Sequence, residues 1–230
     1  YGGLGDRFGL NAWRAIVIGD LFDEIWATIL AGAADPQAGL RVFEEEHQAV
    51  LDAIALSWPA FLKQVAATAR RLGAIELKRP YAEIPKISLV GEIYVRNDPI
   101  SLQNLVERLA EKGFIVRTSK TSEWIKYLDW LARNNIESDG RGLGFWIRHW
   151  LKGHMDAAVR KRLRACGLFF WEDAKVAPVM EAGRRFISPQ LTGEAILTVG
   201  SALHEMLHPS CGVILIGPFG CMPSRVAESI

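Results

Sequence analysis

A cysteine follows a glycine turn near the end of the chain, in the segment Gly217-Pro218-Phe219-Gly220-Cys221-Met222-Pro223. The apolar run 211–216 before it predicts a buried strand, and the residues after it predict a helix. Cys221 would then lie at a helix N-terminus, where unpaired backbone N–H groups and the helix dipole stabilise a thiolate. Such a thiolate can act as a nucleophile or bind a soft metal or an iron–sulfur cluster, and Gly217 and Gly220 allow close backbone approach to a bound group. A buried structural cysteine is the alternative interpretation.

A second candidate is the segment His204-Glu205-Met206-Leu207-His208, which matches the H-E-x-x-H pattern of zinc peptidases. On one helix face, His204 and His208 would bind zinc and Glu205 would act as the general base. Pro209 ends the helix directly afterwards, so two helical histidines beside a solvated glutamate are the alternative interpretation. A zinc hydrolase therefore remains an alternative function.

Polar residues also cluster at the C-terminal end of the first strand that the sequence predicts, in the segment Glu92–Pro99. Ligands of open α/β sheets bind outside the carboxyl ends of the strands, so Arg96 and Asn97 are candidates for binding a phosphate or carboxylate. A plain loop capped by Asp98 is the alternative.

The elements that would position these residues fall into two regions. Residues 1–80 have apolar side chains at every third or fourth position, which predicts a helical region. Residues 81–230 alternate strands (86–95, 114–117 and 211–216) with helices, which predicts a Rossmann-like parallel sheet flanked by helices. The chain begins at Tyr1 without a methionine and stops at Ile230 within a helical pattern, so we expect a fragment of a longer protein whose sheet is truncated at the C-terminal end.

The overall composition excludes several classes of protein. The 230 residues carry a net charge of +1 and are 23% charged and 50% hydrophobic, which disfavours a nucleic-acid binder and a disordered chain. No apolar run reaches the roughly 18 residues of a membrane helix, and no signal peptide is recognisable. The three cysteines are an odd number without paired spacing, which indicates a reducing, cytoplasmic location rather than a disulfide framework.

Four segments, in this order, resemble one known group of proteins. They are Val90–Arg96, Ser122–Tyr127, Gly193–Leu197 and Ile216–Pro223, with Asn11–Asp20 fitting the helical part ahead of them. The group is the dehydratase-like portion of the large acyl-CoA dehydratase activases, also called CoA-substrate-specific enzyme activases, which are related to the 2-hydroxyacyl-CoA dehydratases.

The resemblance implies a role in ATP-driven, low-potential electron transfer for the dehydration or reduction of acyl-CoA substrates. In such modules a cluster of the [4Fe–4S] type is held by cysteines at strand ends, and Cys221 resembles one of these positions. Cys166 and Cys211 match no motif and are guesses as further ligands. The phosphate motifs of the ATPase are absent, so ATP would bind to another domain of the parent chain. The resemblance implies as partners the other domains of that chain, acyl-CoA, or a dehydratase or reductase. A non-catalytic structural or interaction domain is a further alternative.

Overall fold

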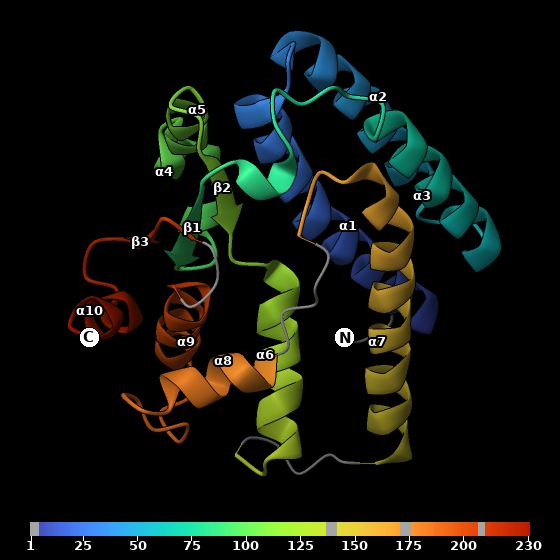
Figure 1. The fold of residues 1–230 in the computed structure, drawn as a ribbon. Coiled ribbons are helices and arrows are strands. Elements are labelled where there is room, and N and C mark those ends of the chain that lie inside the picture. The colour runs from blue at the N-terminus through green and yellow to red at the C-terminus, as the bar shows by residue number, and fades with distance from the viewer. Residues whose placement is uncertain (1–4, 137–141, 171–175, 207–209) are drawn as a thin grey trace. The chain divides into compact units, whose positions relative to one another are not determined.

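The structure, a computed structural model, describes residues 5–136, 142–170, 176–206 and 210–230 (Figure 1). The chain divides into two compact units, each built from two stretches of sequence. The first unit comprises Tyr1–Glu83 and Gly142–Asp173, and the second comprises Ile84–Arg141 and Ala174–Ile230. The predicted boundary at residue 80 lies close to the observed one. However, residues 142–173 belong with the N-terminal helices, whereas the sequence analysis assigned them to the second domain.

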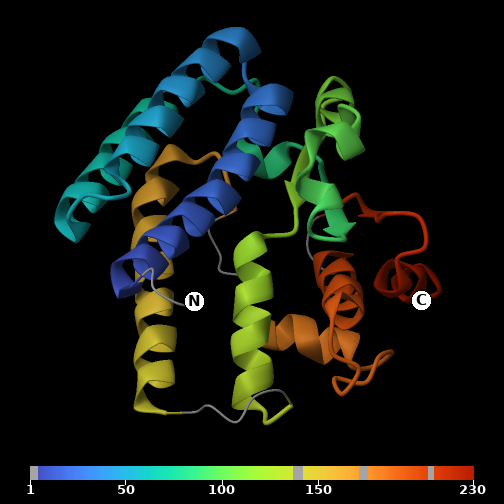
Figure 2. The ribbon, with the colours of Figure 1, turned by 180° about the vertical axis from the view of Figure 1, so that it is seen from behind.

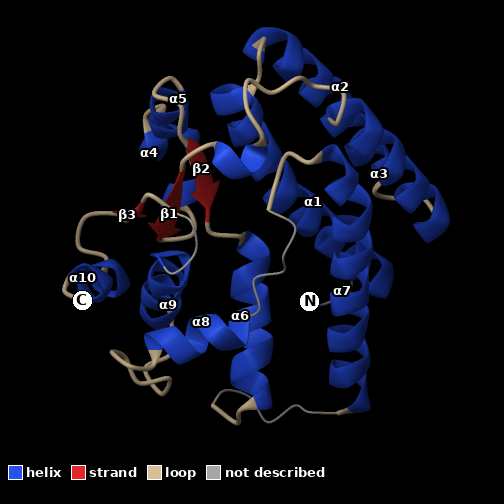
Figure 3. Cartoon of the chain, in the orientation of Figure 1, coloured by secondary structure: helices blue, strands red, loops and turns tan. Residues whose placement is uncertain are grey.

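The regular elements described in the first unit are helices (Figure 3). Its long helices are α1 (Gly5–Gly32), α2 (Pro36–Ala53), α3 (Trp58–Leu72) and α7 (Leu143–Leu163), and its short ones are η1 (Tyr81–Glu83) and η3 (Arg164–Cys166). Asp35 accepts a hydrogen bond from the backbone N–H of Ala38 and so caps α2, which Pro36 begins. Helices α2 and α3 lie side by side, as the view from behind also shows (Figure 2).

The apolar stripe of α1 forms the core of this unit, as its periodicity predicts. Trp13, Val17, Leu21, Ile25 and Ile29 are all buried. Helix α1 contacts both α2 and α7, and α3 contacts α2 and α7. The four helices therefore share one hydrophobic core, to which α7 contributes from more than a hundred residues further along the chain.

The second unit contains a parallel sheet with the strand order β2-β1-β3. The strands are β1 (Lys86–Gly91), β2 (Ile115–Thr118) and β3 (Gly212–Ile216). Their positions and parallel direction confirm the predicted mixed α/β class with helices flanking a small sheet. Strand β1 ends at Gly91, four residues earlier than predicted, and β3 lies at an edge of the described sheet with every residue half-buried. The prediction of a fully buried β3 is therefore wrong, because β1 occupies the central position.

Helices pack around this sheet and against one another. They are α4 (Pro99–Leu102), α5 (Leu105–Ala110), α6 (Thr121–Arg133), α8 (Val176–Gly183), α9 (Glu194–Met206) and α10 (Met222–Glu228), with η2 (Val95–Asn97) after β1. Helix α9 contacts β1 and β3, and α5 contacts β2. A hydrophobic core that includes Tyr127, Val179 and Ile196 joins α6, α8 and α9.

Two glycines permit close backbone contacts in this unit. Gly91 has a φ of +121°, and a Cβ atom there would lie 1.9 Å from the carbonyl oxygen of Ile216 on β3. A Cβ atom on Gly200 of α9 would lie 2.2 Å from the carbonyl oxygen of Val179 on α8. Both contacts are far below van der Waals separation, so only glycine fits at these positions.

We therefore expect Gly91→Ala to destabilise the chain by about 2 kcal/mol or more, since neither the left-handed φ nor the backbone of β3 accommodates a methyl group. Urea unfolding monitored by circular dichroism measures the loss. Gly212→Ala on β3 is the matched control, because a Cβ atom there meets nothing within 4 Å. We expect that control to stay within about 0.5 kcal/mol of the wild type. Equal stability of the two variants would contradict the close approach.

Candidate functional site at the carboxyl edge of the sheet

The three parallel strands end at one edge of the sheet, which we call the carboxyl edge. It consists of residues 92–97 after β1, residues 119–120 after β2 and residues 217–221 after β3. Ligands of open α/β sheets bind at this edge, so it is where chemistry is expected. The structure brings three predicted site segments together here, namely Arg96 with Asn97, the Gly217–Gly220 turn and Cys221.

Arg96 is buried at the centre of the carboxyl edge. Its guanidinium donates hydrogen bonds to the carbonyl oxygen of Gly91 and, over 3.1 Å, to that of Ser119. Its Nη1 atom lies 3.7 Å from Oε1 of Glu194, the first residue of α9. Arg96 thus links the ends of β1 and β2 to α9. This gives its side chain a structural role, and the prediction that it binds a ligand stays a prediction.

The loop after β1 is held by further contacts of its own. Oε1 of Glu194 accepts the backbone N–H of Ile93 over 2.9 Å, and Oε2 of Glu92 accepts that of Val95 over 2.8 Å. Exposed Asn97 donates from Nδ2 to the carbonyl oxygen of Ile93 over 2.7 Å. The loop is therefore fixed in shape. Burial raises the pKa of Glu194, and the nearby Arg96 opposes that rise.

A second buried carboxyl group, Glu123, lies in the first turn of α6. Its Oε1 atom accepts a hydrogen bond from Oγ of Ser201 on α9 over 3.0 Å. Burial raises the pKa of Glu123 above its usual value of 4.5, and Ser201, Arg96 and Lys120 oppose the rise only in part. The side-chain carboxyl groups of Glu123 in α6 and Glu194 in α9 therefore both lie near Arg96.

Cys221 lies at the N-cap position of α10 and is half-buried. Its backbone N–H donates to the carbonyl oxygen of Pro218 over 3.2 Å, which closes the turn, and Gly220 has the left-handed φ of +76° that the turn requires. A Cβ atom on Gly217 would lie 2.2 Å from Oγ of Ser224, so this glycine allows α10 to approach the strand end. The predicted strand–turn–helix around Cys221 is confirmed.

The other two cysteines belong to other parts of the fold: Cys211 precedes β3, and Cys166 is in the first unit. Exposed Cys211 precedes β3, so the five residues of that strand, at roughly 3.3 Å each, separate it from the carboxyl edge. Cys166 is buried in the first unit, where desolvation raises the pKa of its thiol to about 11. Cys211 and Cys221 are thus at opposite ends of one strand and cannot bind a common cluster within this chain.

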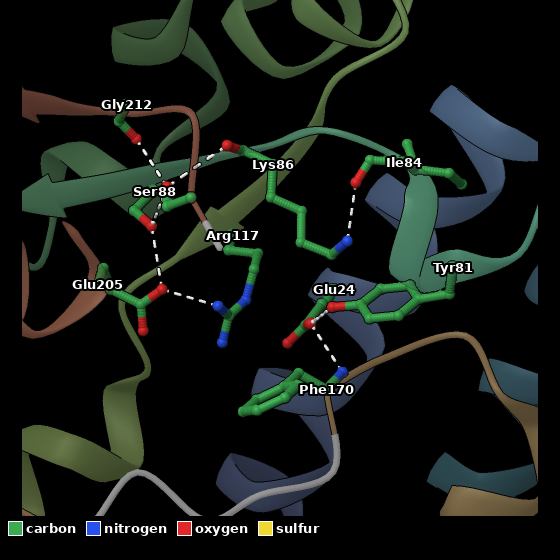
Figure 4. Close-up of polar contacts among 10 residues, drawn as sticks. Glu24, Tyr81, Ile84, Lys86, Ser88, Arg117, Phe170, Glu205 and Gly212 are labelled. Atoms are coloured by element: carbon green, nitrogen blue, oxygen red, sulfur yellow. Dashed lines mark hydrogen bonds and ion pairs between the residues drawn. The ribbon is translucent and has the colours of Figure 1, made fainter. Parts of the chain in front are cut away.

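The H-E-x-x-H segment is described only in part, because His208 lies outside the described residues. Glu205 is near the end of α9, and its Oε2 atom lies 2.7 Å from Nη1 of Arg117 on β2 and 3.1 Å from Oγ of Ser88 on β1 (Figure 4). The carboxylate of Glu205 therefore links α9 to the sheet. The zinc hydrolase stays a prediction.

Within the described ranges, no group of three or more His, Cys, Asp or Glu side chains could bind a metal ion. Sequence reasoning also missed Glu194 and Glu123, whose carboxyl groups lie near Arg96 of this edge. The first turn of a helix commonly carries an acidic residue, so the positions of these two glutamates gave no signal of their contacts with segments that are far away in the sequence.

Comparison of the chain with protein-family models, with curated proteins and with solved structures found no match. Among the described helices, none has the length and apolar character required to cross a membrane.

We expect Glu123→Gln to change how stability depends on pH. Because the pKa of Glu123 is higher in the folded chain than in the unfolded chain, its ionisation destabilises the fold as pH rises above about 4.5. The glutamine can still accept the Ser201 hydrogen bond but carries no charge. Urea unfolding from pH 4 to pH 8 should show the variant gaining stability relative to the wild type as pH rises. A constant difference would contradict the raised pKa.

We expect the cysteines to differ in their reaction with iodoacetamide at pH 8. With a pKa of about 11, only about 0.1% of Cys166 is thiolate at that pH, and the side chain is also buried. Exposed Cys211 should be alkylated at least tenfold faster, as peptide mass spectrometry can measure. Denaturation should abolish the difference. Equal rates in the folded chain would show that Cys166 is accessible.

Proposed function

We propose that this chain is a redox module in which Cys221 is a ligand of an iron–sulfur cluster at the carboxyl edge. The observation that supports the proposal best is the placement of Cys221: a half-buried thiol in a glycine turn at the end of β3, next to the close contact between Gly91 and Ile216. The ordered segments that resemble the dehydratase-like portion of CoA-substrate-specific enzyme activases support the same function.

The donor type fits such a cluster, because iron–sulfur clusters are bound by cysteine thiolates. This edge does not provide all the ligands of a cluster, since Cys221 is the one cysteine among its residues. On this proposal the remaining ligands come from other domains of a parent protein or from a dehydratase or reductase partner. The cluster would supply low-potential electron transfer for an acyl-CoA substrate, with ATP bound by another domain.

The protein's own contribution is to fix the shape of the edge around the thiol. Arg96 and Glu194 fix the loop after β1, and the Gly217–Gly220 turn places Cys221. We further propose that the sheet is part of a larger Rossmann-like sheet that continues at the edge of β3, and that the module works in the reducing cytoplasm. A strand whose residues are almost all apolar is typical of a position inside a parallel sheet.

Anaerobic reconstitution tests the role of Cys221. The whole chain is incubated with ferrous iron, sulfide and excess 2-mercaptoethanol, whose thiolates can complete the coordination, and iron and acid-labile sulfide are then measured after desalting. We expect Cys221→Ala to retain less than a tenth of the iron bound by the wild type.

Cys211→Ala is the matched control, because it removes a thiol from the opposite end of the same strand. We expect this variant to bind as much iron as the wild type. Equal iron in both variants, or none in the wild type, would overturn the proposal.

A further inference from the structure

The contacts of α9 with the rest of the second unit include three glutamate carboxyl groups, and one of them differs from the other two in its partner. Glu194 begins the helix, and its Oε1 atom lies 3.7 Å from Nη1 of Arg96. Near the other end of the helix, Oε2 of Glu205 lies 2.7 Å from Nη1 of Arg117. Glu123 of α6 instead accepts a hydrogen bond from a neutral hydroxyl of α9 over 3.0 Å.

The surroundings of the Glu123 carboxyl favour its protonated form. The residue is only 6% exposed, and its donor is the hydroxyl of Ser201. A buried carboxylate is stabilised by two or three N–H donors or by an adjacent cation, and a neutral hydroxyl is a weaker partner than a charged one. The charged groups that face it from neighbouring segments are Arg96 after β1, Lys120 after β2 and Glu205 on α9. Burial raises the pKa of Glu123, and the hydroxyl and the two cations oppose this rise only in part.

The guanidinium of Arg96 acts on both Glu123 and Glu194, so the two carboxyl groups compete for it. The 3.7 Å separation between Arg96 and Glu194 is an ion contact but is longer than a hydrogen bond. Two ionised carboxylates beside one buried guanidinium leave part of the buried negative charge uncompensated. The proton on Glu123 therefore decides whether the charge of Arg96 is shared.

The pairing of Arg96 also affects the loop after β1. Oε1 of Glu194 accepts the backbone N–H of Ile93 over 2.9 Å, and the guanidinium of Arg96 donates to the carbonyl oxygen of Gly91. A change of charge beside Arg96 thus reaches this loop through two direct contacts.

We propose that Glu123 is a proton-operated switch of the carboxyl edge. While Glu123 holds its proton it is neutral, and Arg96 is paired with Glu194. When Glu123 releases that proton to water at higher pH, its carboxylate draws the guanidinium of Arg96 toward α6, and the loop at Ile93 is held less firmly. The switch uses residues other than Cys221, so it is independent of the proposed cluster.

Infrared spectroscopy of the whole chain in D2O tests whether Glu123 holds a proton. The C=O stretching band of protonated carboxyl groups is followed from pH 5 to pH 9. We expect the wild type to show a band at pH 7 that Glu123→Gln lacks. Ser201→Ala leaves Glu123 in place but removes its donor, so it should move the loss of the band to higher pH.

Glu181→Gln is the matched control, because Glu181 is an exposed carboxyl of the same unit, paired with Arg184. This variant should keep the band of the wild type at pH 7. Spectra of the wild type and Glu123→Gln that do not differ at pH 7 would overturn the proposal.

Amide hydrogen exchange measured by NMR tests the coupling to the loop. The protection of the Ile93 N–H is taken relative to its intrinsic exchange rate at each pH. We expect this protection to fall by about tenfold or more between pH 6 and pH 9 in the wild type and in Glu181→Gln, but to stay constant in Glu123→Gln. Circular dichroism confirms that each variant is folded. The same pH dependence in the wild type and in Glu123→Gln would also overturn the proposal.

Discussion

The geometry of the carboxyl edge depends on one buried guanidinium, that of Arg96. It donates hydrogen bonds to the carbonyl oxygens of Gly91, at the end of β1, and Ser119, directly after β2. It also lies close to the carboxylate of Glu194 at the start of α9. These segments are remote from one another in the sequence. Removing one partner from a buried charged group leaves the other uncompensated, which typically costs about 3–5 kcal/mol. These contacts help to hold the loop after β1 in its shape. The turn at Cys221 is coupled to that loop because Gly91 directly contacts the end of β3.

In the first unit, buried carboxylates likewise join segments that are far apart in the sequence. Glu24 of α1 accepts hydrogen bonds from the hydroxyl of Tyr81 over 2.5 Å and from the backbone N–H of Phe170 over 2.9 Å (Figure 4). Glu46 of α2 accepts from Oγ1 of Thr68 on α3 over 2.5 Å. A buried carboxylate is stable only where donors satisfy it, so each of these groups specifies which segments must meet. Glu24 in particular explains why the segment that ends near Phe170 returns to the N-terminal helices.

The distribution of the cysteines shapes the functional proposal. Cys166 is embedded in apolar surroundings with a raised pKa, Cys211 is exposed at the start of β3, and Cys221 is half-buried at its end. A thiol in a glycine turn beside a rigid loop is suited to binding a group that is shared with another polypeptide.

Local patterns in the sequence predicted much of the secondary structure. The apolar stripe of α1, the three strands and the turn before Cys221 all follow from side-chain periodicity, glycine and proline, which act over a few residues. The candidate site was predictable to the same extent: Arg96 and Cys221 were placed at strand ends, but the burial of Arg96 and its contact with Glu194 were not foreseen. The edge position of β3, the return of residues 142–173 to the first unit and the separation of the cysteines were likewise decided only by the tertiary structure. The physical reason is that these features rest on contacts such as that between Arg96 and Glu194, in which each partner is chosen by burial and charge across about a hundred residues of chain.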